Sequence, residues 1–584
     1  MEGDVSERDS ANGTMDEDSS RRNNVSGETN TEDNVSRVTT FEELMVLVGS
    51  GGRWNLTLFT LCALSAFVTP WSAMTYQFLG ITPDYWCHVA PLVAANWTTQ
   101  QILALAIPKN NDTGQVNGCF IRNYNYTAAV ELGFDKSLAN ESAIALPNAD
   151  ILSCTSHQFN LSQYDSTIVT EWDLVCDRRP LYSTTQAASQ LGTLFGSIIY
   201  GYMLDMIGRR KSVLTSAVLS LIVSFLTVAS PNVETYIFMR ALLQVVDFGC
   251  YTGCLLVTME LCTPRQRNYV ASFFLLPWAV GYMMVPGVAY LVRPWRWMLV
   301  AFTIPVFYYL IYFWMLPESP RWLILHSQYE EAIKILHWAA KVNRKTLPSD
   351  EILITALKNI RMKEKPSKDD QESTAEVTSP GQWVVAVLKY IFILVTDAKV
   401  RIRALVVIYL WFATGMIYYG VSHNAENLSA DIYIYFFLSG LFEVPAYLFL
   451  LPAITTLGRR KTLTLLFLAC GVSICLVVAL MIMQQELVGV KIFLSLMGKM
   501  AITAAFQLIW VYTMEVFSTK HRSRALGAAS MFCRIGSMCS PYINDIMGEV
   551  VVWGPSALFS SVALMGASLV YILPETTNNI MPHH

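Results

Sequence analysis

Charged residues are scarce in this chain of 584 residues: Asp, Glu, Lys and Arg make up 15% of it, whereas 53% of it is hydrophobic. Soluble domains average about 25% charged residues, so this composition excludes an ordinary water-facing globular protein. The net charge of −4 lacks the basic excess that nucleic-acid binding requires. Because the mean hydropathy is +0.38, we expect the apolar residues to face a lipid bilayer.

The motifs of common enzymes are also missing. The sequence has no Gly-x-x-x-x-Gly-Lys-Ser/Thr run, so ATP-driven chemistry has no support. It has no His-Glu-x-x-His, and its eight histidines are scattered, which gives no pattern for a metal site. We therefore expect no enzymatic activity, no cofactor and no bound metal.

Long apolar runs dominate the pattern. A helix needs about 17–25 residues to cross a hydrocarbon core of about 30 Å, and strands of a membrane barrel would be shorter and alternating. The sequence therefore predicts an all-α membrane protein with twelve spans. They lie at 56–79, 181–204, 213–230, 235–258, 268–291, 297–316, 404–421, 432–453, 462–483, 492–513, 525–547 and 550–573.

Lys and Arg are divided unevenly between the two sets of loops. The loops after the even-numbered spans hold 25 of them, and the short opposing loops hold 3. Basic loops stay in the cytoplasm, so this bias predicts that both termini are cytoplasmic. Residues 1–54 form an acidic tail without a signal-peptide pattern, and residues 574–584 form the other end.

A polar loop of about a hundred residues, 80–180, separates the first two spans on the predicted outer side. It contains five glycosylation sequons, at Asn96, Asn111, Asn125, Asn140 and Asn160. It also contains four cysteines, Cys87, Cys119, Cys154 and Cys176, which allow three disulfide pairings. An even number of cysteines in an oxidising compartment favours a glycosylated, disulfide-bonded external loop on a plasma-membrane protein.

Three local patterns occur twice in the same order. Residues 208–211 (GRRK) recur at 458–461, and residues 316–319 (LPES) recur at 573–576 as LPET. A glutamate followed seven residues later by an arginine also recurs, as Glu260 with Arg267 and Glu515 with Arg522. The repeat predicts two six-helix halves, 55–316 and 404–573. A basic cytoplasmic linker, 317–403, joins them and includes an amphipathic helix.

Two parallel six-helix halves are typical of transporters that bind their substrate near the midplane of the membrane. Residues 201–211 (GYMLDMIGRRK) resemble the loop signature of the major facilitator superfamily. More narrowly, the chain over residues 41–577 resembles solute carrier family 22, the organic cation, organic anion and carnitine transporters. The supporting stretches are 41–53 before the first span, 171–176 (EWDLVC), 317–323 (PESPRWL) and 574–576 (PET). The resemblance implies a major facilitator fold and transport of small organic ions by alternating access.

Charged residues near the cytoplasmic ends of the spans are candidates for gating. Ion pairs there would hold the cytoplasmic face closed while the cavity opens outward. The alternative is that the basic residues only retain the loops in the cytoplasm. The candidates are Asp205, Arg209, Arg210, Glu260, Arg267, Arg459, Glu515 and Arg522.

Charges within the spans are the main candidates for the substrate site, since they are costly in lipid. The spans contain Arg240, Asp247, Glu443, Lys499, Arg534 and Asp545. Of these, Arg534, Glu443 and Lys499 are the candidates for the substrate site, whereas we expect Arg240 and Asp247, seven residues apart on one helix face, to organise packing. In the family that the chain resembles, anion and carnitine transporters have arginine at the position of Arg534, whereas cation transporters have aspartate. Glu443 matches a carboxylate that the family associates with substrate. The alternative is that Arg534 and Glu443 have a structural role only, neutralising each other or charges on other helices.

Aromatic residues are expected to complete the site, with Lys499 as a counter-charge or a tie between helices. The aromatic candidates are Tyr418, Tyr419, Trp278 and Tyr251. We expect a secondary transporter that favours organic anions or zwitterions such as carnitine. Transport of organic cations is the second candidate function, and a non-transporting receptor on the same fold is the third. The sequence does not identify a coupling ion.

Overall fold

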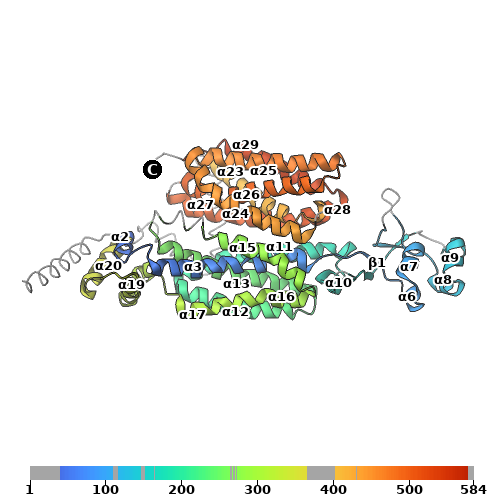
Figure 1. Cartoon of the computed structure of the whole chain (residues 1–584), viewed down its shortest axis with the longest axis horizontal. Coiled ribbons are helices and arrows are strands. Elements are labelled where there is room, and N and C mark those ends of the chain that lie inside the picture. Colours follow the sequence, from blue (N-terminus) through green and yellow to red (C-terminus); the bar gives the residue numbers. More distant parts are fainter. Residues whose placement is uncertain are drawn as a thin grey trace, which may run out of the picture.

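The computed structural model describes residues 40–109, 116–146, 151–162, 165–263, 266, 270, 273–364, 401–428, 431–517 and 519–576. Figure 1 shows two helical bundles side by side, the N-terminal one in blue to yellow-green and the C-terminal one in orange to red. The loop 80–180 extends from one end of the bundles, which we call the loop end. Helices α18 to α20 lie at the opposite end, which we call the linker end.

The N-terminal half begins with a broken helix. Its helices are α3 (Arg53–Val68), α4 (Pro70–Ala73), α5 (Tyr76–Leu79), α11 (Arg179–Ile207), α12 (Arg209–Val228), α13 (Val233–Glu260), α15 (Leu276–Leu291), α16 (Trp295–Thr303), η3 (Ile304–Ile311) and α17 (Tyr312–Met315). The first span is interrupted before Pro70, whose ring nitrogen cannot donate a helical hydrogen bond. The interruption therefore has a local cause in the sequence.

The C-terminal half repeats the plan. Its helices are α23 (Arg401–Ser422), α24 (Ile432–Leu457), α25 (Arg459–Ile482), α26 (Val488–Val516), α27 (Thr519–Tyr542), η5 (Ile543–Met547), α28 (Gly548–Val550) and α29 (Gly554–Val570), with the short η4 (Glu426–Leu428). The halves meet where α11 packs on α27 and α15 packs on α24.

Helical segments cover all or part of each of the twelve predicted spans. In the described part of the chain, eight helices are long and apolar enough to cross a membrane, and α15 and α29 are shorter apolar helices. The all-helical membrane fold is thus confirmed, while the number of crossings stays a prediction. At the linker end, α2 (Phe41–Leu47), α18 (Pro320–Leu325), α19 (Tyr329–Asn343) and α20 (Asp350–Glu364) pack on one another and on α3 through a shared apolar cluster.

The loop 80–180 folds around two short antiparallel strand pairs. Its elements are β1 (Tyr85–Cys87), α6 (Ala90–Ala94), α7 (Thr99–Leu105), β2 (Phe120–Arg122), α8 (Tyr126–Leu132), α9 (Phe134–Ala139), η1 (Glu141–Ala143), β3 (Ile151–Ser153), β4 (His157–Phe159), α10 (Ile168–Trp172) and η2 (Cys176–Arg178). Strand β1 pairs with β4 and β2 pairs with β3.

Two disulfides close this loop, Cys87–Cys154 and Cys119–Cys176, which selects one of the three pairings that the sequence left open. The sequon asparagines Asn96, Asn125, Asn140 and Asn160 are exposed, and Asn111 lies outside the described residues. Their glycosylation stays a prediction.

Candidate substrate site and gating contacts

A buried ion pair lies in the C-terminal half. Glu443 on α24 and Lys499 on α26 approach to 3.1 Å between Oε1 and Nζ, and both side chains are fully buried. An isolated charge at this depth would be unfavourable, so each of these charges requires the other. The predicted site residues Glu443 and Lys499 therefore belong to one unit.

Tyrosines enclose this pair. The Tyr418 hydroxyl donates to Glu443 Oε1 at 2.8 Å, and the Tyr447 hydroxyl donates to Oε2 at 3.0 Å. Lys499 Nζ lies 3.2 Å from the centroid of the Tyr418 ring, a cation–π contact, and it donates to Ser422 Oγ at 2.5 Å. Glu443 thus has a partner for each carboxylate oxygen, and its charge is matched by Lys499.

Sequence reasoning missed Tyr447 and Ser422. Tyr447 lies four residues after Glu443, one helical turn along the same face, so the spacing was a usable signal. Ser422 contributes from the end of α23, on a helix far from Lys499 in sequence, and no local pattern indicates that contact.

Arg534 on α27 has a different environment. It is half-buried, and no acidic side chain lies within ion-pair distance of it among the described residues. Its charge acts on the Tyr251 hydroxyl of α13, in the other half, so the guanidinium lies toward the junction of the halves. Glu443 pairs with Lys499 and not with Arg534, which agrees with the structural alternative in its second form, neutralisation by another helix.

The remaining aromatic candidates divide between the two halves. Tyr419 is buried and packs edge-on against Tyr418 at 5.2 Å between ring centroids. Tyr251 packs against Phe274 at 5.9 Å. Trp278 on α15 is partly buried and contacts both large apolar clusters. Tyr251 is within electrostatic range of both Arg534 and Tyr419, which lie in the other half.

The loop ends of the two halves are joined by direct polar contacts. Tyr76 of α5 and Ser183 of α11 both donate to the Asp545 carboxylate, and the Ser183 bond is 2.6 Å long. Arg179 forms an ion pair with Glu549 across the same junction. The sequence identified Asp545 as a costly charge but not as a contact between halves.

Apolar contacts reinforce this junction. Phe78 packs against Phe436 at 4.8 Å between ring centroids and against Tyr433 at 5.6 Å. Gln77 donates from its side chain to the His423 carbonyl.

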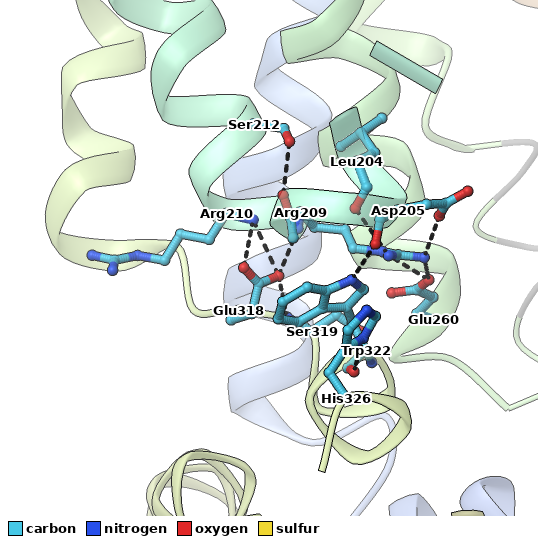
Figure 2. A network of polar contacts seen from close by, with 11 residues as sticks. Leu204, Asp205, Arg209, Arg210, Ser212, Glu260, Glu318, Ser319, Trp322 and His326 are labelled. Atoms are coloured by element: carbon cyan, nitrogen blue, oxygen red, sulfur yellow. Dashed lines mark hydrogen bonds and ion pairs between the residues drawn. The ribbon is translucent and has the colours of Figure 1, made fainter. Parts of the chain in front are cut away.

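Figure 2 shows the network at the linker end of the N-terminal half, which we call the N-half network: Asp205, Arg209, Glu260, Glu318 and Trp322. The Arg209 guanidinium lies 2.8 Å from Glu260 and 3.1 Å from Asp205. Glu318 Oε1 accepts from the backbone N–H of Arg209 at 2.7 Å, at the start of α12. A carboxylate at a helix N-terminus is favourable because unpaired N–H groups point toward it.

Two further contacts complete this network. The Trp322 indole donates to the Asp205 carbonyl at 2.8 Å, and Arg210 donates to the Leu316 carbonyl at 2.8 Å. Burial is the largest influence on Glu318 and raises the pKa of its carboxyl group, against the opposing effect of its backbone hydrogen bonds.

The C-terminal half repeats this arrangement in what we call the C-half network: Arg459, Glu515, Glu575 and Thr576. Arg459 Nε lies 3.2 Å from Glu515, and the Arg459 backbone N–H donates to Glu575 at 3.0 Å. The Thr576 hydroxyl donates to Glu515 at 2.5 Å.

The repeated glutamates Glu260 and Glu515 therefore pair with Arg209 and Arg459, the first arginines of the two GRRK segments. Arg267 lies outside the described residues, and the Arg522 side chain is not described. The predicted pairing of Glu260 with Arg267 and of Glu515 with Arg522 stays a prediction.

Two repeated helical halves, with ionisable residues buried in the spans, define the class of a secondary transporter. The sequence profile of the family described as "Sugar (and other) transporter" matches residues 142–581. The chain is 30% identical over 547 residues to an organic cation transporter-like protein of Drosophila melanogaster, covering 93% of this chain and 91% of that protein. It is 28% identical to solute carrier family 22 member 3 of Mus musculus, covering 93% and 94%.

A solved structure shows the same fold. The xylose transporter XylE from E. coli, in a partially occluded inward open conformation, superimposes with a TM-score of 0.57 at 14% identity, covering 90% of this chain and 99% of that one. The chain belongs to solute carrier family 22 of the major facilitator superfamily. It is a multi-pass membrane protein and a secondary transporter of organic ions, not an enzyme.

Proposed function

We propose that the protein carries organic anions across the plasma membrane by alternating access, with Arg534 binding the anionic group. One observation supports this most strongly: Arg534 has no acidic partner among the described residues, whereas Glu443 is matched by Lys499. The central region thus has one positive charge available to substrate.

A guanidinium suits this role because its planar N–H groups bind a carboxylate or a sulfonate in a bidentate manner. Tyr251 is within electrostatic range of Arg534 and would contact an apolar substrate body. A zwitterion such as carnitine would need a second, negative group. Because Glu443 already has three partners, we rank carnitine below simple organic anions.

Alternating access requires that contacts between the halves form and break. The contacts of Asp545 and of the Arg179–Glu549 pair join the halves at the loop end, which we propose to be extracellular. We propose that these contacts close the outer face in this state, and that the N-half and C-half networks hold the loops at the cytoplasmic face.

Organic cation transport is the second candidate. Two observations support it. Tyrosine rings cluster around Lys499, and such rings also bind substrate cations. A relative from Drosophila melanogaster is an organic cation transporter-like protein.

Uptake into vesicles that contain the protein separates these candidates. The probes are a labelled aryl sulfonate, labelled carnitine and labelled tetraethylammonium. We expect saturable sulfonate uptake that falls at least about tenfold in Arg534→Asp, since the loss of a charge-assisted bidentate contact costs about 1.5–3 kcal/mol. Lys358→Asp, at an exposed position of α20, makes the same change of charge away from the site and should retain uptake.

Two outcomes would contradict the proposal. Saturable uptake of tetraethylammonium without sulfonate uptake would identify a cation carrier. Binding of any probe without flux would identify a receptor.

A further inference from the structure

Both disulfides of the loop 80–180 contact the same histidine. His157, at the start of β4, has its Nε2 atom 3.3 Å from Cys154 Sγ and 3.5 Å from Cys176 Sγ. These two sulfurs belong to different disulfides, Cys87–Cys154 and Cys119–Cys176. The His157 side chain is 5% exposed, so its contacts with sulfur are shielded from water. The imidazole thus lies between two bonds that thiols can open.

Asp173 fixes the orientation of this ring. Its carboxylate lies 2.8 Å from His157 Nδ1. Because Nδ1 is directed to Asp173, Nε2 is the ring atom that faces the sulfurs, and in the doubly protonated ring it donates toward them. Asp173 and Cys176 have φ of +52° and +50°, a region that residues other than glycine rarely adopt. Such backbone conformations cluster at functional sites.

The Cys87–Cys154 disulfide is poorly placed for exchange with a thiol. In such an exchange a thiolate attacks one sulfur, and the other sulfur leaves with the electron pair. Cys87 is fully buried, so the attack is confined to Cys154 and expels Cys87. Cys87 Sγ lies 3.4 Å from the Gly118 carbonyl oxygen, whose partial negative charge opposes that of a thiolate. We therefore expect this disulfide to open slowly.

The Cys119–Cys176 disulfide is better placed, because both of its cysteines are partly exposed. Attack on Cys119 expels Cys176, whose sulfur lies 3.5 Å from His157 Nε2. A cation beside a thiolate stabilises it and promotes its departure. Attack on Cys176 instead would expel Cys119, which faces the neutral Tyr85 hydroxyl at 3.6 Å. The exposed Asp177 beside Cys176 also repels an anionic thiol, so attack on Cys119 is favoured.

We propose that Cys119 is a modification site for small thiols such as glutathione, with His157 as the general acid of the exchange. The incoming thiolate bonds to Cys119 Sγ, the Cys119–Cys176 bond breaks, and Cys176 Sγ leaves with the electron pair. His157 Nε2 gives its proton to that sulfur. One disulfide forms for the one that is broken, so the thiol is the co-reactant and no further oxidant or reductant is needed.

The modification frees the start of α11 from the loop. Cys176 begins η2, which leads directly into α11. Arg179 and Ser183 of α11 contact Glu549 and Asp545 in the other half. The exchange thus removes a covalent tie between the loop and a helix that contacts the other half at the loop end. The inference goes beyond the proposed function and does not depend on which organic ion is carried.

Mass spectrometry of the purified full-length protein in detergent tests the proposal without any substrate. The protein is incubated with reduced glutathione at neutral pH, free thiols are blocked with N-ethylmaleimide, and the modified peptides are quantified over time. We expect glutathione on Cys119 together with a blocked thiol on Cys176. This product should form at least about tenfold faster than any product of the Cys87–Cys154 disulfide.

Three variants separate the role of the ring from a general effect on the loop. In His157→Gln the exchange should slow at least about tenfold, and the preference for Cys119 over Cys176 should fall. Asp173→Asn, which keeps a residue that tolerates positive φ, should slow the exchange about threefold and lower the same preference. His88→Gln changes an exposed histidine of the same loop and should exchange like the unchanged protein.

The proposal is overturned if His157→Gln exchanges as fast as the unchanged protein or faster, since a loosened loop would speed the opening of both disulfides. It is also overturned if glutathione appears on Cys176 or Cys154 in preference to Cys119, or if neither disulfide of the unchanged protein exchanges. Failure of the anion proposal would instead appear in the uptake panel and leave these rates as expected.

Discussion

The N-half and C-half networks share a sequence pattern but differ in the burial of their ion pairs. The Arg209–Glu260 pair is 2.8 Å apart, with side chains 12% and 14% exposed. The Arg459–Glu515 pair is 3.2 Å apart, with side chains 27% and 23% exposed. Ion pairs gain strength as solvent is removed, so we expect the N-half pair to be the stronger one.

Two residues account for much of the difference. The N-half network includes Asp205, one helical turn before Arg209, whereas the matching position before Arg459 is Thr455. The N-half network is also covered by Trp322 of α18, which donates to the Asp205 carbonyl. The repeat thus preserves the glutamates that cap α12 and α25, while the neighbouring partners differ: Asp205 and Trp322 in the N-half network and the Thr576 hydroxyl in the C-half network.

The largest expected effect comes from the glycines that begin the two GRRK segments. Gly208 and Gly458 have φ of +104° and +84°, a region that side chains rarely adopt. A Cβ at position 208 would also lie 2.5 Å from Glu318 Oε2. We expect Gly208→Ala and Gly458→Ala each to lower the free energy of unfolding by about 1–3 kcal/mol.

Thermal unfolding of the purified protein in detergent measures these losses. Gly201→Ala on α11 is the control, because a Cβ there meets nothing within 4 Å. A loss at position 208 or 458 no larger than that of Gly201→Ala would contradict the view that the positive φ requires glycine.

A smaller effect is expected from the repeated carboxylates that pair with arginine. We expect Glu260→Gln to lower stability by about 1–2 kcal/mol and Glu515→Gln by about 0.5–1 kcal/mol, because the first is more buried. The effect of Glu515→Gln should diminish at high salt, since exposed pairs are screened, while that of Glu260→Gln should persist. Unfolding midpoints at low and high ionic strength check this, and the opposite salt dependence would reverse the ranking of the networks.

Much of the architecture was predictable because bilayer thickness sets the length of apolar runs and the repeat marks the halves. The break in the first span also had a visible cause at Pro70. The glutamates of the LPES and LPET segments recur in the sequence, and their role at helix starts follows from that recurrence.

Partner choice inside the bundle was not predictable from the sequence. Glu443 could meet Lys499 or Arg534, because all three lie on different helices and helix rotation decides which charges face each other. The contact of Asp545 with Tyr76 joins residues 469 positions apart, so no spacing indicates it. The disulfide pairing likewise depends on how the strands of the loop pair.

The smallest expected effect comes from exchanging the residue that distinguishes the two networks. Thr455→Asp would place a carboxylate one turn before Arg459, as Asp205 lies before Arg209 at 3.1 Å. Asp205 is 74% exposed, so we expect a gain of only about 0.3–0.5 kcal/mol from Thr455→Asp and a similar loss from Asp205→Thr. Unfolding midpoints at neutral pH and low ionic strength measure both effects, and Thr455→Asn is the uncharged control. If Asp205→Thr instead lowered stability by several kcal/mol, the Asp205 side chain would hold the N-half network together in place of the buried Glu260 pair.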